Sequence, residues 1–390
     1  SAEHRDLDTD RLAMTRHFPL LMSVAALFGL GLGIYDFVLP FLLRHWGFSF
    51  LNMGLIFAVA GVAMVFVRVY MGELSDRFGR KAFYATALGV GAALTVVTPM
   101  APHMAAQMGL KSLRDASFQT FQSMHQLVLY EESVDRYLDY VGKTQGAQYL
   151  AEGLGAQFGG AVLARRGHAA PLRMGAAALL VAFLGFVLLY RSPPVQRRRE
   201  RARSLRELFG LDLSPKLRLM TIANFIFTVG LATSHCFVMQ LFFKEKFGVS
   251  AATVATIMLL HRLTAALPLL LVGWVVKRHL KAVYITFLTF EGIALIVSAF
   301  IPTFLAATIV WLTHDLFGAG IWIPLQSTLM QQHSRDGVRG RDVSKSLAIA
   351  SLGWIFGPMI AGAVFARSLG APFAISGLLM VVAAVVLLGL

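Results

Sequence analysis

Long apolar runs alternate with short polar turns along almost the whole chain. Twelve of these runs approach the length of about 20 residues that a helix needs to cross a bilayer. They cover residues 17–43, 50–71, 82–102, 104–128, 143–164, 170–190, 218–243, 251–276, 280–301, 303–330, 345–366 and 370–390. The runs are continuously apolar and lack the alternation that barrel strands show. The pattern therefore predicts an all-α membrane protein with twelve transmembrane helices.

One hydrophilic stretch is much longer than the other turns, and it divides the runs into two sets of six. It covers residues 191–217 and contains Pro193-Pro194 followed by a run of arginines. We interpret it as a cytoplasmic basic linker that lies against the lipid headgroups. The predicted order is a cytoplasmic arm, a six-helix bundle, this linker and a second six-helix bundle, over residues 1–16, 17–190, 191–217 and 218–390.

The two sets of six runs resemble each other at an offset near 200 residues. Tyr35–Pro40 lies over His235–Gln240, and Gly159–Arg165 lies over Ala361–Arg367. Matches in the same order are hard to explain by chance similarity between apolar helices. Parallel six-helix repeats are typical of transporters that hold their substrate near the bilayer midplane, between two pseudo-symmetric halves.

Composition and charge agree with a lipid environment. Hydrophobic residues make up 57% of the chain and charged residues 14%, whereas soluble chains carry about 25% charged residues. The net charge of +14 comes from segments between the runs, so it does not indicate a nucleic-acid partner. With a cytoplasmic N-terminus, 24 Lys and Arg lie on the cytoplasmic side and 7 on the other. This bias predicts two cytoplasmic termini, and the short turns favour a bacterial inner membrane.

A charged loop between the second and third runs carries a motif. It reads Gly72-Glu73-Leu74-Ser75-Asp76-Arg77-Phe78-Gly79-Arg80-Lys81. Every defined position of G-x-L-(S/A)-D-R-x-G-R-(K/R) matches, so the chain resembles the major facilitator superfamily of secondary transporters. The resemblance implies a gating latch that holds the halves in an outward-open state, formed by Gly72, Asp76, Arg77, Gly79 and Arg80. Glu131 and Glu132 could pair with the arginines.

Polar side chains within the runs are the candidates for a substrate and proton path. An ionisable group in a span costs about 3 kcal/mol and usually faces a cavity or a partner. The candidates are Tyr35, Asp36, Arg114, Asp115, Gln122, Glu152, His235, Cys236, His261, Arg262, His314 and Asp315. The repeat relates some of them, because Arg114-Asp115 and His314-Asp315 stand 200 residues apart.

These features together predict a secondary active transporter that moves a small solute by alternating access. The chain has no G-x-x-x-x-G-K-(S/T) loop, so we expect no nucleotide cofactor, and we expect no enzyme activity. Carboxylates beside titratable histidines favour H⁺ as the coupling ion. A small organic solute is the leading substrate, and an anion is a candidate because Arg114 and Arg262 lie within runs. We expect the protein to act as a monomer.

Two other interpretations stay open. A divalent-metal carrier, loosely similar to ferroportin-like members of the superfamily, would use Asp36, His235 and Cys236 as ligands. A receptor or scaffold would keep the fold without moving a solute, although the intact loop motif argues against it. Replacement of Asp36 would stop coupled flux in the leading case, abolish metal binding in the second and have little effect in the third.

Overall fold

The computed structural model describes residues 17–132, 137–191, 209–276, 278–335 and 338–390, and their regular structure is helical throughout. The N-terminal half contains α2 (Phe18–His45), α3 (Phe50–Phe78), α4 (Arg80–Val97), η2 (Thr98–Met100), α5 (Met104–Glu132), α6 (Tyr137–Arg166) and α7 (Ala169–Leu189). The C-terminal half contains α9 (Pro215–His235), α10 (Val238–Phe247), α11 (Ala251–Val275), α12 (Leu280–Phe300), α13 (Phe304–His314), η3 (Asp315–Ala319), α14 (Gly320–His333), α15 (Arg339–Ser351), α16 (Gly353–Phe365) and α17 (Ala371–Leu387). The predicted arm, 1–16, and most of the predicted linker lie outside the described residues.

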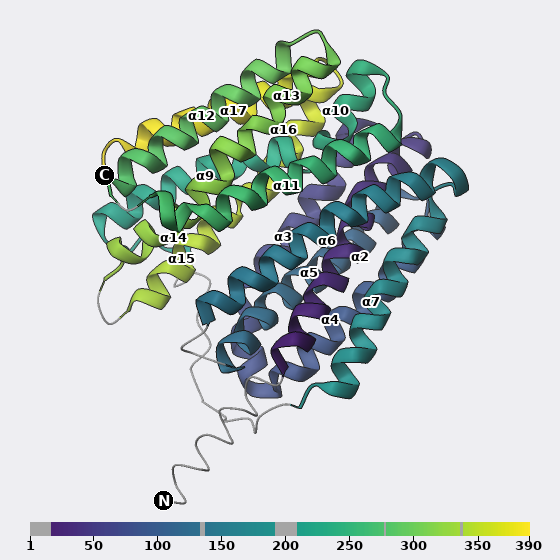
Figure 1. The fold of residues 1–390 in the computed structure, drawn as a ribbon, viewed down its shortest axis with the longest axis horizontal. Helices are drawn as coiled ribbons and strands as arrows, with labels where there is room; N and C mark the ends of the chain where they lie inside the picture. The colour runs from purple at the N-terminus through teal and green to yellow at the C-terminus, as the bar shows by residue number, and fades with distance from the viewer. Residues whose placement is uncertain (1–16, 133–136, 192–208, 277, 336–337) are drawn as a thin grey trace, which may run out of the picture.

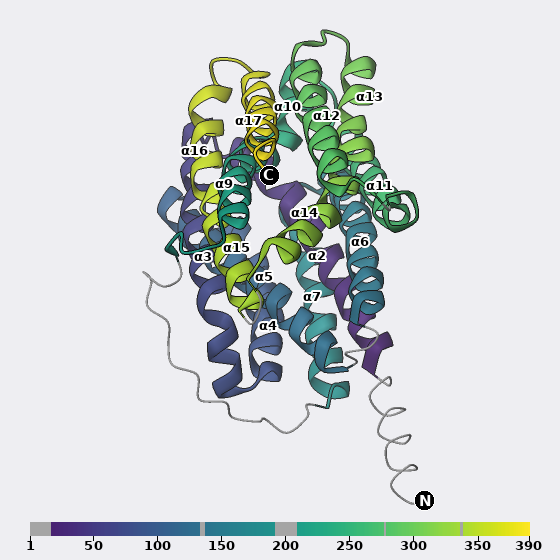
Figure 2. The ribbon, with the colours of Figure 1, turned by 90° about the vertical axis from the view of Figure 1, so that its left-hand side faces the viewer.

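The two halves lie side by side. Figure 1 shows α2 to α7 in purple to teal on one side and α9 to α17 in green to yellow on the other. In Figure 2, turned by 90°, the helices of both halves again run along a common long direction. α2 and α10 meet between the halves, where Gln240 Nε2 donates a hydrogen bond to the Asp36 carbonyl oxygen at 3.4 Å.

Nine helical segments in the described part of the chain are long and apolar enough to cross a membrane. The predicted spans 104–128, 143–164 and 370–390 are not among them. Lys111, Arg114 and Asp115 lower the mean hydropathy of α5, and polar residues do the same in α6. α17 is apolar but has only 17 residues. The all-α membrane fold is therefore confirmed, and the count of twelve spans stays a prediction.

The outward faces of several helices are apolar and uncovered. Large hydrophobic side chains recur there every three or four residues, as expected for one face of a helix. On α7, α12 and α17 they are Leu180, Val181, Leu184, Leu188, Ile293, Val297, Phe300, Leu378, Val382 and Val385. A soluble protein rarely exposes so much contiguous apolar surface, and a bilayer would cover it.

Glycines allow α2 and α6 of the N-terminal half to approach each other closely. A Cβ atom on Gly33 would lie 2.0 Å from the Glu152 carbonyl oxygen, and one on Gly155 would lie 2.3 Å from that of Leu30. Small residues commonly allow such contacts between membrane helices. The contact positions the polar side chains of α2 and α6 at the interface with the other half.

The halves are in direct contact at the end of the bundle where α2 and α10 end. There Arg44 Nε lies 3.6 Å from Glu245 Oε1, across the two halves. A Cβ on Gly54 of α3 would lie 2.4 Å from the Pro358 carbonyl oxygen of α16. The backbone-to-backbone fit leaves no room for a solute between α3 and α16 at this level.

Candidate functional site

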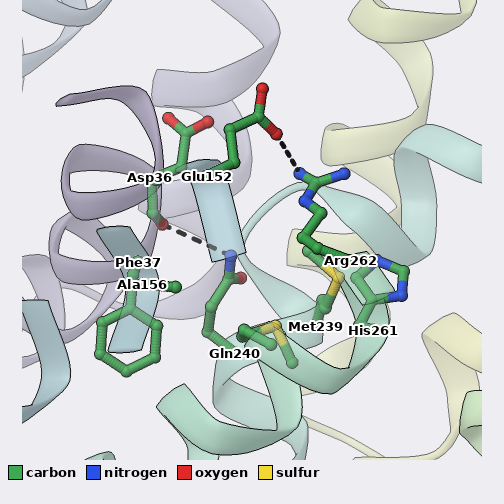
Figure 3. A pocket seen from close by; sticks show the side chains of 10 residues that line it. Asp36, Phe37, Glu152, Ala156, Met239, Gln240, His261 and Arg262 are labelled. Carbon is green, nitrogen blue, oxygen red and sulfur yellow. Dashed lines mark hydrogen bonds and ion pairs between the residues drawn. The ribbon is translucent and has the colours of Figure 1, made fainter. Parts of the chain in front are cut away.

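A pocket lies at the interface of the two halves. Its empty volume is ≈ 330 Å³, part of it open to solvent. The lining residues are Gly33, Asp36, Phe37, Glu152 and Ala156 from the N-terminal half and Met239, Gln240, Met258, His261 and Arg262 from the C-terminal half (Figure 3). Half of these lining residues are polar or charged, and they converge between apolar side chains, an arrangement that can bind and orient a small molecule.

An ion pair crosses the pocket and joins the halves. Arg262 Nη2 of α11 lies 3.0 Å from Glu152 Oε2 of α6, the contact that is dashed in Figure 3. The Glu152 side chain is only 4% exposed, and Gln148 Nε2 donates to its other oxygen at 2.9 Å. The Arg262 guanidinium also lies 5.6 Å from the centre of the Tyr149 ring. Because the two partners belong to different halves, this pair must separate whenever α6 and α11 move apart.

A second group of charges lies within the N-terminal half. Arg114 Nη1 is 3.8 Å from one oxygen of Asp36 and 3.8 Å from one oxygen of Asp115. Lys111 Nζ contacts Asp115 Oδ2 at 2.7 Å, and the Tyr35 ring lies 4.2 Å from the Arg114 guanidinium. Two cations and two carboxylates balance here. The Asp36 side chain is 45% exposed while that of Arg114 is 3% exposed, so Asp36 is the member that a solute can reach.

A third group lies in the C-terminal half and contains three histidines around one carboxylate. His261 Nδ1 contacts Asp315 Oδ2, and His314 Nε2 lies 3.5 Å from Asp315 Oδ1. The His235 ring centre lies 5.8 Å from that of His261 and 5.6 Å from that of His314. Of these residues, only His261 lines the pocket.

Two helices of this third group, α9 and α13, end at the histidine that they supply. α9 ends at His235, and Cys236 has ψ −100°, outside the helical region. α13 ends at His314, and a π-helical turn, η3, begins at Asp315 with Phe317 at φ −112°, ψ 18°. Such π-helical turns are frequent at functional sites.

The formal charges of the three groups do not cancel. The carboxylates are those of Asp36, Asp115, Glu152 and Asp315, and the permanent cations are Lys111, Arg114 and Arg262. One negative charge is left when the histidines are neutral. Asp315 carries that charge, because its neighbours in the salt bridges of the described residues are histidines alone.

The structure does not bring the predicted metal ligands together. Asp36 faces Arg114, and Cys236 Sγ is 3.9 Å from the Thr233 carbonyl oxygen. Among the described residues, one group of three potential ligands converges, with its ligand atoms within 4.8 Å of one another. Its members are His261, His314 and Asp315. Of the set expected from the sequence, only His235 lies beside this group.

The described part of the loop motif ties α4 to its neighbours. Gly79, between α3 and α4, has φ 91° and ψ 138°, a backbone conformation that favours glycine. Arg80 pairs with Glu131 at the end of α5. Lys81 Nζ binds the Tyr190 carbonyl oxygen at 2.6 Å, beyond the end of α7. These contacts lie within the N-terminal half.

Of the other motif positions, Gly72, Asp76 and Arg77, the structure describes the helical backbone of α3 and not the side-chain environment. The gating latch therefore stays a prediction. Gln122, another candidate for the path, is half-buried on α5 and does not line the pocket.

Several pocket residues were not singled out in the sequence. Gln240 is the clearest case, because it lies on α10 and donates a hydrogen bond to the Asp36 carbonyl oxygen across the halves, and the internal repeat places it opposite Pro40. Gln148 and Tyr149 hold the Glu152–Arg262 pair from one turn away. In the sequence, they are marked only by lying four and three residues before Glu152 on the same helix. Residues at that spacing are equally common in ordinary helix packing, so the position of α11 is needed to recognise their role.

Comparisons with known proteins agree on the family. A family model described as Major Facilitator Superfamily matches residues 21–341 and 220–390. Multidrug resistance protein 2 of Bacillus subtilis (strain 168) is 23% identical over 382 residues, which is 94% of this chain and 92% of that protein. The niacin transporter NiaP of Acinetobacter baylyi is 32% identical over 72 residues, 18% of this chain and 16% of that one.

Solved structures share the fold. The nucleoside transporter NupG superposes with a TM-score of 0.79 at 16% identity, over 95% of this chain and 99% of that chain. The human organic anion transporter MFSD10 gives 0.70 at 15% identity, over 96% and 99%. Identities this low establish a common architecture and leave the cargo open.

Proposed function

We propose that this chain, which belongs to the major facilitator superfamily, is a proton-coupled secondary transporter of a small organic molecule. Its family and fold make it a multi-pass membrane transporter with a small-molecule substrate, and not an enzyme. The proposal concerns the coupling ion, the substrate class and the residues that carry them. The observation that supports it is the buried ion pair of Glu152 and Arg262, which spans the pocket between the halves.

The pair offers a direct way to couple a proton to movement. Glu152 is buried, so its carboxylate is stable as an anion only while Arg262 and Gln148 contact it. When the halves separate, the carboxylate either stays buried without its cation or takes up a proton. A proton on Glu152 removes the penalty and lets α6 and α11 move apart. Proton binding and the change of access are thereby linked.

The same step provides a place for the substrate. Protonation of Glu152 frees the Arg262 guanidinium, which is 33% exposed and can then bind a carboxylate or another anionic group. Phe37, Met239 and Met258 would contact the apolar part of the molecule. We therefore favour a small organic anion. The relatives carry unlike cargoes by name, namely drugs, niacin, nucleosides and organic anions, so their names do not choose among substrates.

A second substrate class has one observation in its favour. The Asp36 carboxylate is 45% exposed and opens to the pocket, so it could pair with an organic amine. An amine would bind Asp36, on the N-terminal side of the pocket, whereas an anion would bind Arg262, on the C-terminal side. The proposal also includes a monomer in a bacterial inner membrane. Its two termini are cytoplasmic in this proposal, and the 24-to-7 bias of Lys and Arg supports that orientation.

Proteoliposomes with an imposed proton gradient test the proposal. Uptake of radiolabelled nicotinate, uridine and ethidium represents an anion, a neutral nucleoside and an organic cation. We expect gradient-driven uptake of nicotinate, which Glu152→Gln uncouples from the gradient and Arg262→Gln abolishes. Glu245→Gln is the matched control, because Glu245 also pairs across the halves, with Arg44 at the rim of the bundle.

Each outcome has a defined meaning. Uptake that ignores the gradient in the unaltered protein would refute proton coupling. Preference for ethidium, lost in Asp36→Asn, would replace the anion by the amine class. Equal losses in the Glu245 and Glu152 variants would show that any ion pair between the halves matters, and that Glu152 has no special role.

A further inference from the structure

The histidine group of the C-terminal half is not used by the proposed transport step. His261, His314 and Asp315 are 3%, 0% and 3% exposed, so the group is buried almost completely. Buried ionisable groups in a membrane protein are costly, and they persist where something compensates them. The permanent cations of the neighbouring groups are engaged with Asp36, Asp115 and Glu152 in the described structure.

The proton positions on His314 can be assigned from its contacts. His314 Nδ1 lies against the Trp311 carbonyl oxygen, which can only accept a hydrogen bond. Nδ1 therefore carries the proton, and Nε2 of the neutral ring presents a lone pair. That Nε2 is buried and has no hydrogen-bond partner in the described structure. It lies 3.5 Å from Asp315 Oδ1, which is also a lone-pair atom.

Two lone-pair atoms that face each other in a buried site repel unless a cation lies between them. On the other side of the carboxylate, His261 Nδ1 contacts Asp315 Oδ2 in a close approach that a proton or a metal ion on the nitrogen would make favourable. A dication would compensate both contacts at once, because neutral imidazole and carboxylate are its preferred ligands.

The spacing suits such an ion after small side-chain rotations. The three ligand atoms lie within 4.8 Å of one another. In a tetrahedral zinc site with bonds of about 2.0–2.1 Å, ligand atoms stand roughly 3.3 Å apart. Metal-bound histidines commonly donate their other N–H to a carbonyl, which fixes the ring, and His314 does so to Trp311.

A fourth ligand is within reach. The His235 ring centre lies 5.6 Å from that of His314, and its Nδ1 lies 2.8 Å from Ser234 Oγ, so Nε2 is its available atom. The ion would enter from the pocket, because His261 lines it. Figure 3 shows the Arg262 guanidinium directed at Glu152, with His261 on the side of Arg262 away from that pair.

We propose that His261, His314 and Asp315 bind a divalent transition-metal ion of the zinc class beside the transport pocket, with His235 completing the site. The set differs from the metal ligands that the sequence suggested. The inference goes beyond the proposed transport of an organic molecule and does not depend on it, because Asp36, Glu152 and Arg262 take no part in it.

Calorimetric titration of the full chain in detergent with Zn²⁺ at pH 7.5 tests the site. We expect one ion per chain, and at least a 10-fold weaker binding in His314→Gln and in Asp315→Asn. Binding should also weaken at pH 5.5, since metal ligands must be deprotonated. His168→Ala is the control, because His168 stacks on His45 with ring centres 4.6 Å apart in a histidine pair remote from the pocket.

Replacement of a buried residue could prevent folding, so a second measurement uses the unaltered chain. Co²⁺ added to the metal-free protein should give the intense visible absorption of a tetrahedral site, and Zn²⁺ should remove it. No binding of Zn²⁺ and no such absorption would overturn the proposal. So would binding that His168→Ala removes and Asp315→Asn leaves intact. Uptake by the same variants reports on proton-coupled transport separately.

Discussion

Arg262 lies 3.0 Å from the carboxylate of Glu152, and this contact connects α11 of one half to α6 of the other. Removal of both charged side chains leaves no unpaired charge, whereas removal of one leaves the other buried alone. For a fully buried pair, removal of one partner lowers the free energy of unfolding by about 3–5 kcal/mol. Arg262 is 33% exposed, so water screens part of that cost.

The first prediction concerns the stability of this pair. We expect Arg262→Gln to lower the free energy of unfolding by roughly 2 kcal/mol at pH 7.5, because Glu152 loses its cation. Glu152→Gln with Arg262→Gln should recover much of that loss, because neither charge remains. Thermal unfolding in detergent measures both. If the double variant is less stable than Arg262→Gln, the charges are not coupled.

The second prediction concerns the turn between α3 and α4. Gly79→Ala forces a side chain into a backbone with φ 91° and ψ 138°, so we expect a loss of about 1–3 kcal/mol. Gly185→Ala is the matched control, because a Cβ there meets no atom within 4 Å. A Gly79→Ala chain as stable as the control would mean that the turn relaxes without strain.

The third prediction concerns the balance between conformations. A Cβ on Gly61 of α3 would lie 2.4 Å from the Trp354 carbonyl oxygen of α16. Gly61→Ala should therefore disfavour the conformation in which these helices touch. Spin labels at Leu51→Cys and Lys244→Cys should show a larger share of long distances by electron paramagnetic resonance.

The control for that experiment is Gly109→Ala, where a Cβ meets no atom within 4 Å. An unchanged distance distribution in Gly61→Ala, with folding preserved, would show that α3 and α16 tolerate the methyl group without moving apart.

The fourth prediction concerns pH and Glu132, the last residue of α5, beyond the predicted span of 104–128. Burial, with the neighbouring Glu131 adding to it, raises the pKa of Glu132 to about 7. The folded state therefore holds this proton more tightly than the unfolded state, so Glu132 lowers stability as the pH rises through 7. Glu132→Gln should raise Tm by roughly 2 °C at pH 8.

At pH 4.5 the same substitution should change Tm much less, because Glu132 is protonated in the folded protein and about half protonated in the unfolded chain. Thermal unfolding at both values checks the sign. A gain at pH 4.5 as large as that at pH 8 would point to packing of the amide rather than to the charge.

The sequence was sufficient for the family and for the choice of most candidate residues. A charged side chain in an apolar run is conspicuous whatever its surroundings, so Asp36, Glu152 and Arg262 could be found from their positions alone. The loop motif identified the superfamily, which the family comparison confirms. The resemblance between the halves also placed Gln240 opposite Pro40, but it did not indicate that the Gln240 side chain would line the pocket.

Pairing between helices could not be found in this way. Arg114 lies 3.8 Å from Asp115, beside it on α5, and 3.8 Å from Asp36, which belongs to α2. Nothing along the chain indicated that Glu152 would meet Arg262, because they are on helices of different halves. The side chains of Asp36, His235 and Cys236, expected to bind a metal, do not converge for the same reason. The position of a residue along a helix does not show how that helix is rotated about its axis in the bundle.

By itself, the sequence determined the solvent and the architecture of this protein, because the free energy of burying some 20 apolar residues in lipid depends on composition rather than on partners. Only the tertiary structure decided which charges neutralise one another and which do not. Backbone contacts at glycines such as Gly33 fix how a helix is shifted along its axis and rotated about it relative to its neighbour. A charge-assisted hydrogen bond forms only when its two atoms come within about 3 Å of each other, so helix packing decides that Asp315 lies among histidines and Glu152 against Arg262.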